Sequence, residues 1–324
     1  MKRLFHIVLI IFTLIIVSCT GSLEEIDYNN ISGSWIRAVE NTSWSGRISH
    51  TSVVFDNKMW IMGGYEGSSS NMKNDVWYSE DGINWHQATA SAQWGARYEH
   101  TSVVFDNKMW VIGGGFHDSL KNDVWYSDNG ITWTQAIASA SWGIRRDQSS
   151  VVFDNKIWVM GGWNGNRLND VWYSDNGTYW IQATAAANWT GRNDHLSVVF
   201  DNKMWVIGGY DDSDKNDVWY SINGINWIQV TPSAQWVPRD RHSIAVYKNR
   251  IWIMGGINGN ISTEYNDVWY TSDGINWTQT DLTTLWSFRY SHVSQVFNDK
   301  IWLIGGYDEY HGLTYKRDIW YLSY

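Results

Sequence analysis

One motif of about fifty residues occurs six times in this chain, and its repetition restricts the possible folds more than any other feature. Each copy reads approximately W-x-x-R-x-x-H-x-S-V-V-F-D-N-K-M-W-V-I-G-G, then a variable stretch, then N-D-V-W-Y-S-D-G-I-N-W. The first glycine of each pair is Gly63, Gly113, Gly161, Gly208, Gly255 and Gly305, in steps of 50, 48, 47, 47 and 50 residues. A period of this length indicates a repeat architecture in which each copy is one supersecondary unit.

The length of a copy varies in only one place. The repeated arginine precedes the first glycine by 16 residues in every copy, as from Arg47 to Gly63. From the second glycine to the repeated aspartate the steps are 11, 9, 8, 8, 11 and 12 residues. In repeat proteins such insertions lie on one face, which is often the binding face.

Each copy is predicted to form four short antiparallel strands. In the first copy the apolar runs are Val53–Phe55, Met59–Met62 and Asp75–Ser79, and Asp81-Gly82 is a hairpin signal before a fourth strand. Nearly continuous apolar runs indicate strands that are covered on both faces. Four-stranded sheets packed face to face around an axis meet this condition, so the sequence predicts an all-β, six-bladed β-propeller.

The two ends of the repeat region are predicted to meet. The sixth copy ends after its third strand, and a match to the missing fourth strand, Gly33-Ser34-Trp35, lies at the other end of the chain. A strand there would complete the last blade and remove a free sheet edge. Of the 25 tryptophans, all but Trp163 fall at four fixed sites of the repeat, which favours packing between blades over a binding role.

The glycine pair after an apolar strand, the N-D-V-W strand and the spaced aromatics resemble the kelch repeat over residues 33–324. This resemblance implies a propeller of six or seven blades. The family includes protein-binding modules, a copper oxidase and a sialic acid epimerase, so the fold alone does not select a function. The copper oxidase needs a Tyr–Cys cross-link, and residues 33–324 contain no cysteine. No cofactor and no metal site are predicted.

The first residues predict an export signal. Residues 1–18 have a basic start and a 14-residue apolar run, shorter than the roughly 20 residues of a membrane span. Ile16-Val17-Ser18-Cys19 resembles a bacterial lipobox, which implies a lipidated Cys19 followed by a polar tether over residues 19–32. The alternative is an ordinary signal peptide. The interpretation places the protein in a bacterial cell envelope, held in the membrane by lipid. By resemblance to envelope lipoproteins, Thr20 after the cysteine implies the outer membrane or cell surface.

The net charge restricts the partners. The 33 Asp and Glu exceed the 24 Lys and Arg, and two of those basic residues, Lys2 and Arg3, belong to the predicted leader. A surface this acidic argues against nucleic acid as a partner.

The segment R-x-x-H before each innermost strand is the first candidate site. Its arginines are Arg47, Arg97, Arg145, Arg192, Arg239 and Arg289. Guanidinium groups around an axis would form an anion-binding mouth, whereas near-uniform repetition favours a structural role. Departures from the repeat, namely Arg146, Gln148, Asp240 and Arg241, are the more informative residues.

The variable loops are the second candidate site. They carry aromatic residues among Asn, Asp and Gly, which is typical of a binding surface: Tyr65, Phe116, Trp163, Tyr210, Tyr265, Tyr307 and Tyr310.

Three functions remain open from the sequence. The first is a lipid-anchored binding protein that presents the loops and the R-x-x-H segments to a protein or glycan. The alternative is an enzyme for an acidic sugar, similar to kelch-type sialic acid epimerases (mutarotases), with a glutamate as acid/base; Glu66, Glu99, Glu264 and Glu309 are expected near the mouth. A structural or assembly role is the third. No catalytic residue is assigned.

Overall fold

A computed structural model describes residues 33–67, 71–116, 119–282, 286–310 and 312–323. The predicted leader, Cys19 and the tether lie outside these ranges. Within them every regular element is a β-strand, as the sequence predicted, and no helix is long and apolar enough to cross a membrane.

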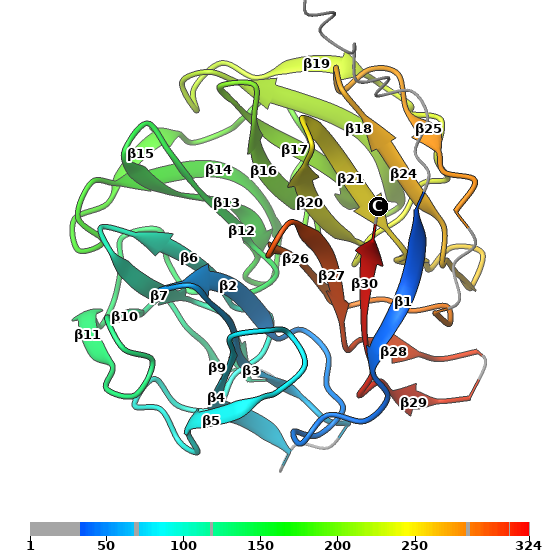
Figure 1. The fold of residues 1–324 in the computed structure, drawn as a ribbon. Coiled ribbons are helices and arrows are strands. Elements are labelled where there is room, and N and C mark those ends of the chain that lie inside the picture. Colours follow the sequence, from blue (N-terminus) through cyan, green and yellow to red (C-terminus); the bar gives the residue numbers. More distant parts are fainter. Residues whose placement is uncertain (1–32, 68–70, 117–118, 283–285, 311, 324) are drawn as a thin grey trace, which may run out of the picture. The chain divides into compact units, whose positions relative to one another are not determined.

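Six four-stranded antiparallel sheets form the blades of a β-propeller (Figure 1). Blade 1 contains β2 (Thr51–Phe55), β3 (Lys58–Tyr65), β4 (Met72–Ser79) and β5 (His86–Thr89). Blade 2 contains β6 (Thr101–Phe105), β7 (Lys108–Ile112), β10 (Val124–Ser127) and β11 (Thr134–Ile137). Blade 3 contains β12 (Ser149–Phe153), β13 (Lys156–Trp163), β14 (Arg167–Ser174) and β15 (Ile181–Thr184). Blades 4 and 5 are β16 (Leu196–Phe200), β17 (Lys203–Tyr210), β18 (Asp214–Ser221) and β19 (Ile228–Thr231); and β20 (Ser243–Tyr247), β21 (Arg250–Met254), β24 (Val268–Thr271) and β25 (Thr278–Gln279).

The sixth blade confirms the predicted closure of the ring. It contains β26 (Val293–Phe297), β27 (Lys300–Ile304), β30 (Ile319–Ser323) and, as its outer strand, β1 (Ser34–Val39). The partners of β1 and β30 include Trp35 and Leu322. The innermost strands also form a closed series, because β2 contacts both β6 and β26. The two ends of the repeat region are therefore held together by backbone hydrogen bonds rather than by a covalent link.

Tryptophan packs between the blades. Trp60 is buried in the core shared by blades 1 and 2, and the turn at Gly130 of blade 2 lies directly on its indole ring. A β-carbon on Gly130 would collide with that ring, and its φ of +73° also favours glycine. The same contact occurs in four other blades, where Gly82, Gly177, Gly224 and Gly274 lie on Trp302, Trp110, Trp158 and Trp205 of the preceding blade. This contact explains why the tryptophan and the glycine repeat together.

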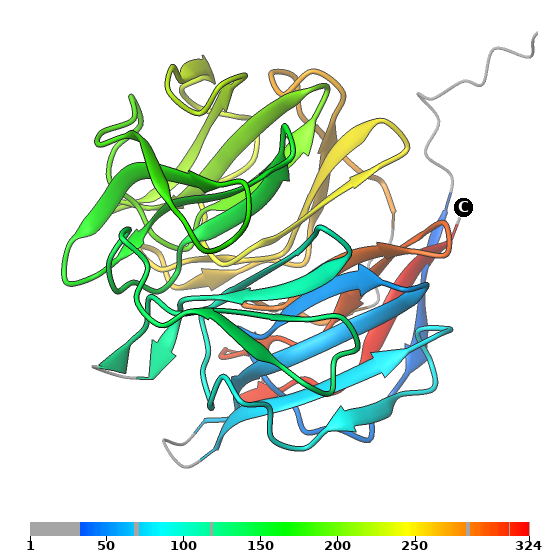
Figure 2. The same ribbon diagram turned by 90° about the vertical axis from the view of Figure 1, so that its left-hand side faces the viewer.

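The variable loops and the R-x-x-H segments lie on one side of the propeller, called here the loop face. In blade 1 the residue after the glycine pair, Tyr65, forms a bridge with Ile48 of the R-x-x-H segment, and equivalent bridges occur in the other blades. Three of these loops form additional small hairpins, β8 (Gly115–Phe116) with β9 (Ser119–Leu120), β22 (Ile257–Asn258) with β23 (Thr263–Glu264), and β28 (Tyr307–Asp308) with β29 (Thr314–Tyr315). Figure 2 shows the blue to cyan strands of the first blade side by side.

Candidate functional site

The first residue of each R-x-x-H segment is buried in an ion pair. Arg47 donates from Nη1 to Asp75 Oδ1 at 2.6 Å and from Nη2 to Oδ2 at 3.0 Å, and Nη1 also donates to the carbonyl oxygen of Gly63 at 2.9 Å. The other five pairs repeat this bidentate geometry: Arg97–Asp123, Arg145–Asp170, Arg192–Asp217, Arg239–Asp267 and Arg289–Asp318.

This geometry contradicts the interpretation of the six arginines as ligand-binding residues of an anion-binding mouth and agrees with the structural role that their repetition favours. Their side chains are at most 2% exposed, and each guanidinium is engaged by a carboxylate and a backbone carbonyl. Each carboxylate also accepts a hydrogen bond from the tryptophan two residues later, as Asp75 does from Trp77 at 2.8 Å. The arginines therefore tie the segment to the N-D-V-W strand of the same blade, because a buried guanidinium requires such partners.

The third residue of each segment forms a ring around the axis, called here the axial ring: Ser49, Glu99, Asp147, Asp194, Arg241 and Ser291. All six have left-handed backbone conformations, with φ between 48° and 56°. Each N–H donates to the carbonyl oxygen of the preceding member at 2.9–3.4 Å, and Ser49 closes the series by donating to Ser291. Non-glycine residues held in this conformation are often found at functional sites.

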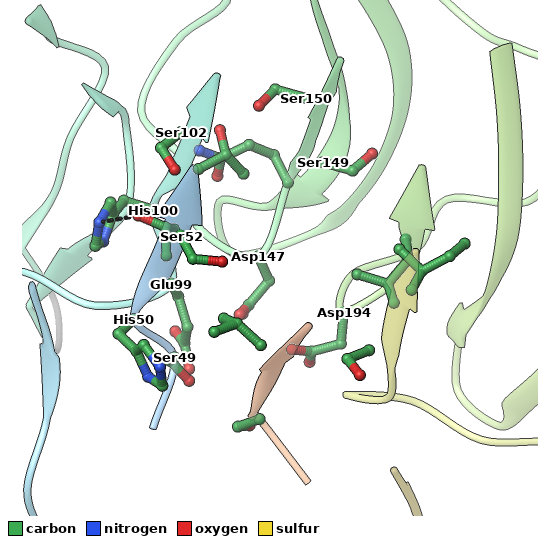
Figure 3. Close-up of a pocket in the computed structure, with 18 of the residues that line it drawn as sticks. Ser49, His50, Ser52, Glu99, His100, Ser102, Asp147, Ser149, Ser150 and Asp194 are labelled. Carbon is green, nitrogen blue, oxygen red and sulfur yellow. Dashed lines mark hydrogen bonds between the residues drawn. The ribbon is translucent and has the colours of Figure 1, made fainter. Parts of the chain in front are cut away.

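A cavity of about 290 Å³ lies on the axis behind this ring. Its wall contains four successive positions of the innermost segments, for example Ser49 to Ser52 and Asp147 to Ser150. Figure 3 shows Glu99, Asp147 and Asp194 on one side of the cavity and Ser102, Ser149 and Ser150 farther along it.

Two arginines of the chain contact the axial carboxylates. Arg146 Nη1 donates to Glu99 Oε2 at 2.7 Å, whereas its Nε is 3.8 Å from the nearer oxygen of Asp147. Arg241 Nε is 3.4 Å from Asp194 Oδ1. Arg146 and Arg241, both candidate ligand-binding residues, thus lie beside the axial carboxylates, and each is engaged with carboxylates of the protein itself.

Three carboxyl groups at the mouth, those of Glu99, Asp147 and Asp240, have raised pKa values. Burial, followed by the nearby Asp194 carboxylate, raises the pKa of Glu99 to about 7. Burial and the carboxylates of Asp194 and Glu99 also raise the pKa of Asp147. Burial and Asp194 raise the pKa of Asp240, which precedes Arg241, to about 8. The ionisation of each of these carboxyl groups therefore depends on the charge of its neighbours.

A layer of histidines lies behind the axial ring. Three of them bond to a hydroxyl of the preceding blade: His100 to Thr51 at 3.1 Å, His195 to Ser149 and His292 to Ser243, both at 2.8 Å. Burial, and next the neighbouring arginine, lowers the pKa of His100 and His195 to about 3. These imidazoles are neutral at physiological pH.

The other three positions of this layer have no such bond. Leu196 and Val293 replace the hydroxyl residue that would face His242 and His50, and neither ring nitrogen of these two histidines has a hydrogen-bond partner. In blade 3 the histidine is replaced by Gln148, whose Nε2 donates to the carbonyl of Ile112 while its Oε1 has no partner. All three residues are at least 96% buried and line the cavity.

Tyrosines from blades 2, 1 and 6 form a continuous arc on the loop face, called here the tyrosine arc: Tyr98, Tyr65, Tyr315, Tyr307 and Tyr290. Successive ring centroids are 5.3, 6.3, 4.6 and 5.8 Å apart. All five rings are partly exposed. Tyr98 and Tyr290 directly precede members of the axial ring, so the arc reaches the mouth of the cavity.

Three of the remaining predicted aromatics have an arginine of the protein stacked on the ring. Arg146 lies over Trp163 at 4.8 Å, Arg167 over Tyr210 at 4.5 Å and Arg239 over Tyr265 at 4.0 Å from the ring centroid. Tyr310 is 47% exposed. The side chain of Phe116 lies outside the described part of the chain.

A family comparison adds to this geometry. A model described as the KLHDC2/KLHL20/DRC7 Kelch-repeats domain matches residues 19–188 and 177–324. The chain belongs to the kelch-repeat family. This confirms the resemblance seen in the repeats, and a kelch propeller supports the role of a protein-binding scaffold. A search among curated proteins found no match.

Only one of the four candidate glutamates lines the cavity of this kelch propeller, namely Glu99. Glu66 pairs with Lys73 at 2.8 Å. Glu264 accepts a hydrogen bond from the backbone N–H of Glu309 at 2.6 Å. In the ranges that the structure covers, no group of three or more His, Cys, Asp or Glu is arranged to hold a metal ion.

Sequence reasoning missed most of the axial ring and part of the arc of this kelch propeller. Asp147, Asp194, Tyr98, Tyr290 and Tyr315 were not singled out. A signal was available, because the two middle positions of R-x-x-H vary from copy to copy while the outer positions barely change. Within the motif, the variable middle positions thus indicate the candidate site, and the nearly constant outer positions indicate the scaffold.

Proposed function

We propose that this protein is a lipid-anchored envelope protein that binds a protein partner on its loop face. The tyrosine arc carries the proposal. Tyrosine combines a large apolar ring with a polar hydroxyl and loses little conformational entropy on binding, which makes it common in interfaces. The arc is built from three blades, so it is wider than a pocket for one small molecule.

The geometry of the arc supports a preformed surface. Tyr65 contacts both Tyr98 and Tyr315, and Tyr307 contacts both Tyr315 and Tyr290. Rings that support one another lose less freedom when a partner covers them than isolated side chains would. The hydroxyl of Tyr290 donates to Glu309 at 3.1 Å, which fixes the end of the arc.

Substitution within the arc tests this proposal. We expect Tyr98→Ala together with Tyr307→Ala to weaken capture of the partner from the native envelope by at least tenfold, since interface aromatics contribute about 2 kcal/mol or more each when they anchor binding. Tyr179→Ala is the matched control, because Tyr179 is 69% exposed in the turn between β14 and β15, away from the loop face. Equal capture by both variants would contradict the proposal.

The lipid anchor is tested separately. We expect Cys19→Ser to move the protein from the membrane fraction to the soluble fraction and to abolish incorporation of labelled fatty acid. A protein that stays in the membrane fraction without label would contradict lipid anchoring at this cysteine.

A second candidate function rests on Glu99. A carboxyl group with a pKa of about 7 beside Arg146 suits proton transfer at neutral pH. The corresponding activity is mutarotation of an acidic sugar such as sialic acid. We expect Glu99→Gln to abolish this activity while thermal unfolding is preserved; if neither protein accelerates mutarotation or gains thermal stability with the sugar, this second function is wrong.

A further inference from the structure

The mouth of the axial cavity contains more carboxylates than cations. Among the residues that the structure describes, Glu99, Asp147, Asp194 and Asp240 face two guanidinium groups, those of Arg146 and Arg241. Glu99 and Asp194 take the short contacts with Arg146 and Arg241.

The two remaining carboxylates, Asp147 and Asp240, have no close ion pair with any described residue. The nearest cation to Asp147 is 3.8 Å away, and its side chain is 6% exposed. Asp240 is 7% exposed, and its Oδ1 accepts no hydrogen bond. Burial raises the pKa of both carboxyl groups, and a cation that entered the mouth would favour their ionised forms.

Unpartnered polar groups on the wall of the cavity give independent evidence for a ligand. Gln148 is 4% exposed, lines the cavity and leaves Oε1 without a donor. The neutral imidazoles of His50 and His242 each offer a nitrogen acceptor that is also unpaired. A ligand that supplies several N–H donors to this depth would satisfy groups that the protein leaves open.

We propose that the mouth formed by Glu99, Asp147 and Asp194 binds a primary ammonium group, and that this group is a lysine side chain of the partner protein. An ammonium is a compact charge with three donors, and it suits carboxylates at separate positions of a ring better than a planar guanidinium fork.

This inference rests on the proposed function, because the same partner would cover the tyrosine arc. Tyr98 precedes Glu99, and Tyr290 precedes Ser291 of the axial ring. The segment that flanks the inserted lysine would therefore lie on the arc. Aromatic rings beside the mouth also favour a cation electrostatically.

Binding is expected to release protons. Glu99 is surrounded by Arg146, Asp147, Asp194, Arg241 and Tyr98, with the neutral histidines behind the ring. Because its pKa is raised to about 7, it is largely protonated below that pH and must ionise to bind a cation. The affinity for an ammonium group should therefore rise about tenfold between pH 6 and pH 8.

The test measures, by titration calorimetry at pH 8, the binding of a blocked pentapeptide with one central lysine to the whole protein. The same peptide with acetyl-lysine removes the charge, an arginine peptide tests the shape of the cation, and spermidine tests a free polyamine as the source. We expect binding of the lysine peptide with release of protons, weaker binding of the arginine peptide, and none with acetyl-lysine.

Isosteric variants locate the site. Asp147→Asn and Glu99→Gln should each weaken the lysine peptide about tenfold, a size typical of losing one carboxylate contact to a charged ligand. Asp212→Asn is the control, since its carboxylate is 89% exposed and pairs with Arg167 outside the cavity. If a variant fails to fold, proton release by the wild-type protein in buffers of different ionisation enthalpy still tests the site.

The outcomes separate this inference from the proposed function. Binding of spermidine without the lysine peptide, equal binding of acetyl-lysine, or absence of all binding would overturn the lysine site. If the mouth variants capture the partner normally but the tyrosine variants do not, the lysine site is wrong and the proposed function stands. If the tyrosine variants capture it normally as well, the proposed function fails.

Discussion

Two positions of the same R-x-x-H segment differ in almost every physical respect. The arginine at the first position is the same in all six copies, fully buried and paired with an aspartate of its own blade. The third position, two residues later, is Ser, Glu, Asp, Asp, Arg and Ser in turn and lines the axis. Sixfold uniformity marks the scaffold here, and loss of uniformity marks the candidate site.

The physical reason lies in the environment of each position. The buried guanidinium at the first position needs the same set of hydrogen-bond acceptors in every blade, so the residue at this position does not vary. The axial residues contribute their backbone to a hydrogen-bonded ring, and this leaves the choice of side chain free. If the buried arginines belong to the scaffold and the axial residues do not, substitutions should differ in their effect on stability, and they are taken here from the largest expected effect to the smallest.

Removing a scaffold arginine should have the largest effect. We expect Arg192→Ala to lower the free energy of unfolding by about 3–5 kcal/mol, because it leaves Asp217 buried without a counter-charge. Urea unfolding at pH 7 measures this loss of unfolding free energy. Arg167→Ala is the control, since its pair with the exposed Asp212 should contribute no more than about 1 kcal/mol. Equal losses in both variants would contradict the distinction between a buried scaffold and an adaptable face.

The contact between turn and tryptophan should come next. Gly130 and Gly95 share a φ of +73°, but a β-carbon meets Trp60 only at Gly130 and nothing within 4 Å at Gly95. Both alanine variants carry backbone strain of about 1 kcal/mol. We expect Gly130→Ala to cost about 1–3 kcal/mol more, from overpacking. Similar unfolding midpoints for Gly130→Ala and Gly95→Ala would show that the indole ring of Trp60 moves to make room for the β-carbon.

The buried histidines should make the protein sensitive to acid. Since burial and Arg192 lower the pKa of His195 from 6.5 to about 3, its contribution to stability is complete above pH 6.5 and is lost as the pH falls towards 3. The loss is about 1.4 kcal/mol per pH unit for each such histidine. His195→Gln, which copies Gln148 of blade 3, should reduce the slope of stability against pH by this amount. An unchanged slope from pH 6 to 4 would contradict a neutral buried His195.

Variants of the axial ring should have the smallest effect on stability. We expect Glu99→Gln to change the free energy of unfolding at pH 7 by less than about 1 kcal/mol, because lost bonding to Arg146 is offset by relief of carboxylate repulsion. The raised pKa of Glu99 gives stability that is present below pH 4.5 and lost as the pH rises through 7. The wild-type protein should therefore lose stability relative to the variant over that range. A loss as large as that of Arg192→Ala would make Glu99 part of the scaffold.

Much of the fold was predictable because its determinants are local. Two of these determinants lie within one blade, namely the spacing from Arg47 to Gly63 and the turn at Asp81-Gly82. The third is the match of Trp35 to Trp85, which can be seen by comparing copies of the repeat. The structure confirms the six blades and the closing strand. The candidate site was only partly predictable. Arg146, Arg241 and Glu99 were named as candidates, whereas the six repeated arginines, also named as candidates although their repetition favoured a structural role, are buried.

The sequence by itself determined the number of blades, the closure of the ring and the family, because the same short-range pattern is written six times and only one architecture uses it repeatedly. The tertiary structure decided which of four adjacent residues faces the axis and which is buried. It also brought Arg146 to Glu99, 47 residues earlier, and Tyr65 to Tyr315 across the closed ring. These contacts depend on the rotation from one blade to the next, which no spacing within a single copy records.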